Sequence, residues 1–228
     1  MKDITIAIEG ATYDGSVAIL RGADVLSERS LSGDDGTLHR AGRGERLMPA
    51  LAECIAEARV RGADVVRVVC GSGPGSFTSL RVAASVAKGL ASGYGVDLYE
   101  VSSLLLTVAG AKSKLAPGPY LSVLDAMRGE FFALRVLVEE DGGTKSMGQP
   151  GVVSRDDIAE LRERKTVVSC IGPGQEIDTG PHARGVAMLL DTILEQGRVD
   201  LSSWEPDYGR LAEAQVRWEA AHGRPLTT

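Results

Sequence analysis

A glycine-rich turn, Gly71-Ser72-Gly73-Pro74-Gly75, is the stretch of this sequence whose residue types best suit anion binding. It follows an apolar run at residues 65–70, typical of a short buried strand, and precedes a segment of helical spacing that starts at Phe77. Backbone N–H groups at a helix start are free, and the helix dipole favours a negative charge there. A tight strand-to-helix turn that needs glycines only for close packing explains the same residues, so both interpretations remain open. The candidates for a phosphate or carboxylate cradle are Gly73, Pro74, Gly75, Ser76 and Thr78.

The two common nucleotide-binding motifs are missing from the sequence, since neither GxxxxGK[ST] nor GxGxxG occurs. A helix terminus contributes about 0.3–1 kcal/mol toward binding an anion, whereas micromolar affinity corresponds to about 8 kcal/mol. We therefore expect that this turn alone does not hold ATP tightly.

The histidine, cysteine and serine patterns predict neither a metal site nor a catalytic residue. Two histidines four residues apart on a helix could share a metal, but the three histidines here are isolated, and we expect each to lie on the surface. The cysteines lie in apolar runs without a CxxC spacing, as buried reduced thiols do. The hydrolase motif GxSxG is also absent. These residues are His39, His182 and His222, and Cys54, Cys70 and Cys170.

The elements that must position the turn form an α/β pattern in the first half of the chain. Short apolar runs predict strands at residues 4–8, 16–20, 25–31, 65–70 and 97–101. Apolar residues at helical spacing predict helices at 45–61 and 77–93, and the polar stretch 32–44 between them predicts a loop.

The second half repeats this order. Strands are predicted at 120–124, 130–138, 145–149 and 166–171, and helices at 156–164, 182–196 and 212–221. Three strands, a helix, a strand, a glycine turn and a helix thus occur twice, and the first strand of each half ends at an acidic residue, Glu9 or Asp125. We predict two βββαβα lobes, at residues 1–102 and 103–228.

Composition indicates an ordinary globular protein that does not bind nucleic acid over a broad basic surface. Apolar residues make up 43% of the 228 residues, and 25 basic against 31 acidic side chains give a net charge of −6. Phosphate contacts need clusters of Lys and Arg, and the excess of acidic side chains argues against them. No run reaches membrane-spanning length and the start is no signal peptide, so we expect a cytoplasmic protein with no membrane contact.

The segment GPGSFTSLRVAASVAKGLA resembles the GPGSFTGLR helix of the TsaB (YeaZ) family. The segments IAIEGAT, LDAMRGEFF and EPDYGRLAEAQVRW resemble other landmarks of that family in the same order, so the resemblance covers nearly the whole chain. It implies an actin-like ATPase (ASKHA, ribonuclease H-like) fold, in which Glu9 and Asp125 would flank a metal–nucleotide. The alternative for each is a solvated strand-end acid, and for Glu9 we favour that alternative over a catalytic role.

The resemblance also implies a function. Members are the non-catalytic subunit of the bacterial machinery that adds threonylcarbamoyl to N6 of the tRNA adenosine next to the anticodon. They act through the catalytic subunit TsaD as a heterodimer, with the ATPase TsaE, and form a homodimer when alone. The chain itself would need no cofactor, although ATP or ADP binding could persist weakly. The alternatives are an autonomous actin-like phosphotransferase and a metal-dependent peptidase relative.

The same resemblance places the partner interface on the two helices of the first lobe. Their small and apolar residues outside the core-facing stripe would contact the partner, with packing of both helices on the sheet of their own chain as the alternative. Ala87 is expected to be exposed within the partner surface. Arg81 would be a fixed donor to an anion or a partner carboxylate, with a local surface ion pair as the alternative. The interface residues expected are Arg81, Val82, Ser85, Val86, Gly89, Met48 and Ala52.

Overall fold

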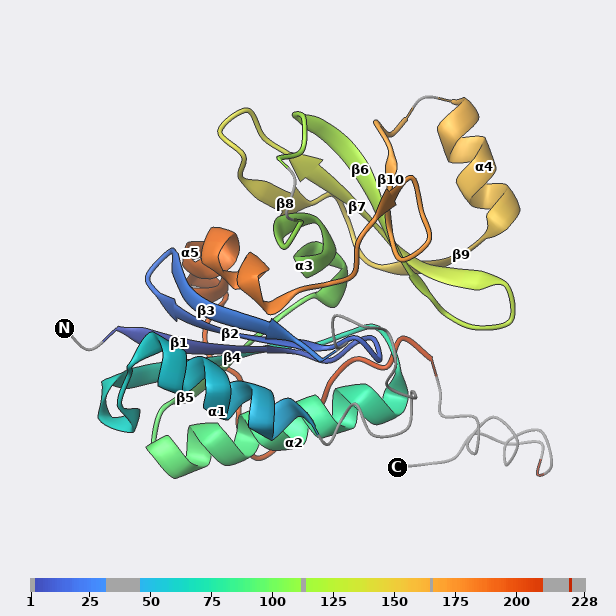
Figure 1. Ribbon diagram of the computed structural model, residues 1–228. Helices are drawn as coiled ribbons and strands as arrows, with labels where there is room; N and C mark the ends of the chain where they lie inside the picture. The colour runs from blue at the N-terminus through green and yellow to red at the C-terminus, as the bar shows by residue number, and fades with distance from the viewer. Residues whose placement is uncertain (1–2, 32–45, 112–113, 165, 211–221, 223–228) are drawn as a thin grey trace.

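The computed structural model describes residues 3–31, 46–111, 114–164, 166–210 and 222, and these form two mixed β-sheets with helices on and between them (Figure 1). The predicted loop 32–44, with His39, and the predicted tail helix 212–221 lie outside these residues. No helix within the described ranges combines the length and the apolar composition needed to cross a membrane.

The first sheet forms where the sequence predicts it. Within the described residues it has five strands in the order β3-β2-β1-β4-β5, with β1–β2 and β2–β3 antiparallel and β1–β4 and β4–β5 parallel. Every residue of β1 is buried, because helices cover both faces of the sheet. The strands are β1 (Ile4–Glu9), β2 (Ser16–Arg21), β3 (Asp24–Ser30), β4 (Val65–Gly71) and β5 (Asp97–Val101).

The second sheet repeats this plan, which confirms the predicted duplication of strand order. Its path β11-β10-β6-β7-β8 has the same sequence of antiparallel and parallel pairings as β5-β4-β1-β2-β3, and β9 pairs with β7 in addition. The strands are β6 (Gly118–Asp125), β7 (Glu130–Val138), β8 (Thr144–Ser146), β9 (Gly151–Ser154), β10 (Cys170–Gly172) and β11 (Ile177–Asp178).

Two helices, α1 (Leu47–Ala58) and α2 (Phe77–Tyr94), lie side by side on the outer face of the first sheet (Figure 1). Helix α1 is shorter than predicted, because Arg59 adopts a left-handed backbone (φ 53°) that ends it. Helix α2 stops after Tyr94, where Gly95 adopts the same left-handed backbone (φ 66°) without the steric cost of a side chain.

Between the sheets lie α3 (Ser103–Ala109) and α5 (Val186–Gln196), each of which packs beyond its own half (Figure 1). Helix α3 follows the first sheet but contacts β6, β7 and β8, whereas α5 follows the second sheet and contacts β5. The sequence analysis missed α3, whose residues are all buried and therefore show no polar–apolar periodicity.

The second half departs from the prediction in several respects. Strand β9 was not predicted, and the strand expected at 166–171 is confined to β10. A glycine turn follows β10, as expected, but the chain then enters β11, so the helix that α2 forms between β4 and β5 has no counterpart there. The predicted helix 182–196 divides into a 3-10 turn (Ala183–Gly185) and α5, and α4 (Arg155–Glu163) occupies the predicted position. The boundary after residue 102 remains a prediction, since residues near the end also return to the first sheet.

That return is anchored by Trp204, which is buried in the core beneath α1 and α2. Its Nε1–H donates to Glu100 Oε2 (2.6 Å), and the Val199 N–H donates to the Leu98 carbonyl (2.9 Å). Trp204 is therefore a packing residue of the first sheet's core.

Candidate functional site

Glu9, at the end of β1, is fully buried, so the interpretation as a solvated strand-end acid is wrong for this residue. Its Oε1 accepts a hydrogen bond from the Ala11 backbone N–H, and its Oε2 accepts one from the Ser103 hydroxyl (2.9 Å). The local β1 pattern could not indicate this, because the partner Ser103 lies 94 residues further along the chain.

Burial raises the pKa of Glu9 from 4.5 to about 7. Loss of hydration disfavours the charged carboxylate, and the hydrogen bonds from Ala11, Ser103 and Gly10 oppose this increase only in part. Glu9 can therefore change its charge near neutral pH, without direct access to solvent.

Glu9 also ties the glycine-rich turn to α3. The Gly73 N–H donates to Ser103 Oγ (3.1 Å), and the Ser103 N–H donates to the Gly73 carbonyl (2.9 Å). A Cβ at Gly71 would lie 1.9 Å from Glu9 Oε2, so only glycine fits beside the carboxyl group. The chain passes to the helix between the sheets at Ser103, and Glu9 therefore lies where the two halves meet.

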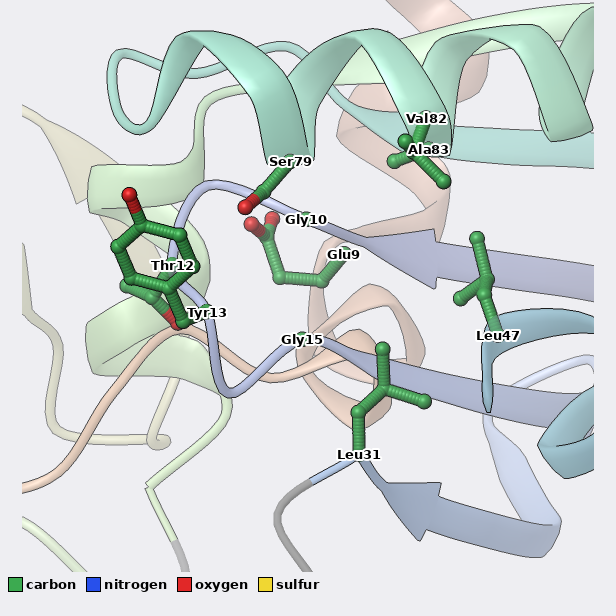
Figure 2. Close-up of a pocket in the computed structure, with 10 residues that line it drawn as sticks. All are labelled: Glu9, Gly10, Thr12, Tyr13, Gly15, Leu31, Leu47, Ser79, Val82 and Ala83. Carbon is green, nitrogen blue, oxygen red and sulfur yellow. The ribbon is translucent and has the colours of Figure 1, made fainter. Parts of the chain in front are cut away.

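A small pocket opens beside Glu9 (Figure 2). Its volume of about 30 Å³ suits one water molecule and excludes a nucleotide. The Glu9 and Ser79 side chains both line it, and the Ser79 hydroxyl donates to Ser76 Oγ (3.1 Å). The lining residues are Glu9, Gly10, Thr12, Tyr13, Gly15, Leu31, Leu47, Ser79, Val82 and Ala83.

Part of the glycine-rich turn packs closely against Ala11 of the loop after β1. The Ser76 N–H donates to the Ala11 carbonyl (2.7 Å), and a Cβ at Gly75 would lie 2.3 Å from that oxygen. Gly73 has φ +95° and precedes a cis peptide bond to Pro74. Ser76 is the N-cap of α2 but makes no side-chain capping bond, and Thr78 is exposed in the first helical turn. The anion cradle at these residues remains a prediction.

Asp125, the counterpart of Glu9 at the end of β6, is exposed. Its Oδ1 accepts the Met127 N–H (2.7 Å) in a turn where Met127 and Arg128 both adopt left-handed backbone (φ 66° and 59°). The duplicated strand order thus places the two acidic residues at the ends of equivalent strands, but only Glu9 is buried.

The predicted interface residues lie on the outer side of α1 and α2. Arg81, Ser85, Gly89 and Ala52 are exposed, Met48 is 49% exposed, and Val82 and Val86 are half-buried. The expectation for Ala87 is wrong: this residue is fully buried, because its position on α2 faces the sheet.

A Ser–His–Glu cluster that sequence spacing did not reveal connects β3 to the turn before α5. His182 is only 8% exposed, which corrects the expectation of a surface histidine. Its Nε2 lies 3.3 Å from Ser30 Oγ, and Glu28 Oε2 lies 3.9 Å from Nδ1 and pairs through its other oxygen with Arg184. The Arg184 backbone N–H donates to Nδ1 (3.1 Å), so the neutral ring carries its hydrogen on Nε2. In this arrangement His182 donates to Ser30 and cannot take its proton, the reverse of a hydrolase triad.

The three cysteines are buried free thiols, as predicted. Burial and the neighbouring Glu9 and Glu100 carboxyl groups raise the pKa of Cys70 far above its usual range. Among the described residues, no group of three or more histidine, cysteine or acidic side chains could hold a metal ion.

Known proteins are similar to this chain in sequence and in fold. The family model TsaD, described as tRNA N6-adenosine threonylcarbamoyltransferase, matches residues 41–161. The tRNA threonylcarbamoyladenosine biosynthesis protein TsaB of Bacillus subtilis is 26% identical over 93% of this chain and 96% of its own length. The TsaB of Escherichia coli is 28% identical over 60% of this chain and 56% of its own.

A solved structure from Pseudomonas aeruginosa, of a protein described as having similarity to the peptidase YeaZ, has the same fold. It covers 91% of this chain and all of its own, with a TM-score of 0.73 and 22% identity. The two duplicated sheets and the match to the TsaD family model agree with the actin-like, ribonuclease H-like fold that the resemblance implied. The chain belongs to the TsaD family and, within it, to the TsaB (YeaZ) family of tRNA threonylcarbamoyladenosine biosynthesis proteins.

Proposed function

We propose that this chain is a non-catalytic subunit that binds and activates a TsaD-type enzyme in threonylcarbamoyl transfer to tRNA. TsaE would join the same complex, and a second copy of the chain would take the place of TsaD when TsaD is absent. Most of the tRNA would be held by the other subunits, because the chain has a net charge of −6.

The single observation that carries this proposal is the open outer face of α1 and α2. On α2, exposed Ser85 and Gly89 follow one another at a spacing of four residues, so they share one side of the helix. A Cβ built at Gly89 meets no atom within 4 Å, so another helix can approach the backbone closely there. Half-exposed Met48 of α1 adds apolar surface to this face.

The state of Glu9 supports a role without chemistry of its own. Both carboxyl oxygens accept hydrogen bonds from the protein, and the adjoining pocket is too small for a nucleotide. We therefore propose that the chain needs no cofactor, that ATP is used by the complex, and that any binding of ATP or ADP to this chain alone is weak.

The substitution Gly89→Glu tests the proposed interface. It fills open space, and replacing glycine inside a helix stabilises the helix by about 0.5–1 kcal/mol, so the fold remains intact. The added carboxylate lies on the contact surface and is expected to abolish binding to the TsaD-type subunit, measured by calorimetry and sedimentation. The matched control is Gly151→Glu, which adds the same charge at an equally open position in β9 of the other sheet.

The proposed interface is refuted if the Gly89→Glu chain binds as well as the Gly151→Glu chain. ATP or peptide turnover by the purified chain alone would favour the phosphotransferase or peptidase alternative instead.

A further inference from the structure

Residues 205–210, here called the strap, cross the glycine-rich turn after the chain has returned to the first sheet. The Asp207 N–H donates to the Ser72 carbonyl (2.7 Å), and Pro206 is buried. The Asp207 carbonyl lies against Gly73, where a Cβ would be only 2.1 Å from its oxygen. The strap therefore fits the turn closely, and the missing side chain at Gly73 makes the fit possible.

The strap also fixes Arg81, one of the exposed residues of the proposed interface. The rings of Tyr208 and Phe77 lie 4.6 Å apart and are tilted by 46°. The Arg81 guanidinium carbon lies 4.1 Å from the Phe77 ring centre and 5.7 Å from that of Tyr208, and its Nε–H donates to the Tyr208 hydroxyl (3.4 Å). Two aromatic rings and one hydrogen bond thus restrict a long side chain that would otherwise sample many rotamers.

At its other end the strap reaches the second sheet. Gly209 has φ +68°, and a Cβ there would lie 2.4 Å from Phe132 and 2.7 Å from Pro74. Arg210 forms an ion pair with Glu130 and lies 5.9 Å from the Phe132 ring centre. The strap therefore connects β7 to the start of α2.

We infer that the strap positions Arg81, through Tyr208, to receive a carboxylate side chain of the partner that binds α2. This inference rests on the proposed function. The Nε–H of Arg81 is used within the chain, which leaves the two Nη groups for an external acceptor, and a planar guanidinium matches a carboxylate in two parallel hydrogen bonds. Arg81 precedes Ser85 and Gly89 at four-residue spacing, so this donor lies at one end of the open face. Tyr208 is a positioning residue, because it acts through Arg81.

The test measures the affinity of the full chain for the TsaD-type subunit by calorimetry. Arg81→Ala removes the guanidinium donor, whereas Tyr208→Ala keeps it but releases the side chain from its fixed position. We expect Tyr208→Ala to bind about 5- to 10-fold more weakly than the unmodified chain, because binding must then order one long side chain. Tyr208→Phe keeps the ring and is expected to recover most of the affinity. Arg81→Lys is expected to behave like Arg81→Ala, because the ammonium group lacks the planar fork.

The decisive comparison is the double variant Arg81→Ala/Tyr208→Ala, which should bind no more weakly than Arg81→Ala alone, because Tyr208 acts only through Arg81. The control is Arg155→Ala, which removes an arginine 5.6 Å from the Phe131 ring centre on the other sheet and should leave affinity unchanged. Additive losses in the double variant, or unchanged affinity of Tyr208→Ala, would overturn the inference.

A second readout needs no partner. NMR relaxation at the Arg81 Nε–H group should report a more mobile side chain in Tyr208→Ala than in the unmodified chain, because the guanidinium loses one aromatic ring and its hydrogen bond. Unchanged mobility would overturn the inference on its own. If the unmodified chain does not bind the TsaD-type subunit at all, the proposed function fails, and the relaxation experiment still decides whether Tyr208 holds Arg81.

Discussion

Replacing Glu9 by glutamine should remove the pH dependence of stability that the buried carboxyl group imposes on the folded chain. Glutamine has nearly the same shape and can still accept the Ala11 N–H, but it cannot ionise. In the unmodified chain, the folded state holds the Glu9 proton up to a pKa of about 7, whereas the unfolded chain releases it near 4.5. Between these values the folded state binds more protons, so stability falls as the pH rises.

The size of this effect follows from the interval between the two pKa values. A difference of 2.5 pKa units (7 minus 4.5) corresponds to about 3 kcal/mol of unfolding free energy. The unmodified chain has lost about 1 kcal/mol of this stability at pH 5 and nearly all of it by pH 8. The Glu9→Gln chain carries no such loss. Its stability relative to the unmodified chain should therefore rise by about 2–3 kcal/mol between pH 5 and pH 8.

Urea unfolding at pH 5, 6, 7 and 8 at constant ionic strength measures this difference. Other groups titrate in both chains and cancel when the two are subtracted. The control is Asp125→Asn at the equivalent strand end, which makes the same substitution of a carboxyl group by an amide at an exposed position. Parallel stability curves for the unmodified and Glu9→Gln chains would refute the reasoning that burial governs Glu9.

Three further predictions concern packing and can be checked by urea or thermal unfolding. Leu104→Ala in fully buried α3 should cost about 2–5 kcal/mol, because a cavity remains between the sheets, and a loss below about 1 kcal/mol would contradict that packing. Gly71→Ala should cost more than about 2 kcal/mol by forcing Glu9 aside, and the loss should shrink when Glu9→Ala is present in the same chain. Trp204→Phe should cost about 1.5–3 kcal/mol by leaving Glu100 without its indole donor, and an equal cost when Glu100→Leu, which has no acceptor, is already present would argue against that bond.

The elements that the sequence predicts well are those whose signal is local. Strand β4, the glycine-rich turn and helix α2 carry an apolar run, a cluster of glycines and helical spacing within a single stretch of 30 residues. Strands β1, β2 and β3 were likewise predicted from short apolar runs in the local sequence. The duplication was also predictable, since it requires only the order of elements.

The features that the sequence could not reveal depend on distant contacts. Helix α3 is apolar all round because it lies between two sheets, so it lacks the periodicity by which a surface helix is identified. The burial of Glu9 requires Gly71 and Ser103, and the orientation of Arg81 requires Tyr208, 127 residues away. Such residues are brought together only by the completed fold.

The most direct test of the proposed role is threonylcarbamoyl transfer to tRNA in a reconstituted system. The system contains a TsaD-type subunit, TsaE and threonylcarbamoyl-adenylate, with this chain present, omitted or replaced by the Gly89→Glu variant. We predict transfer with the unmodified chain, little or none when it is omitted or carries Gly89→Glu, and none from this chain alone. Transfer by this chain alone, or undiminished transfer when it is left out, would contradict the account.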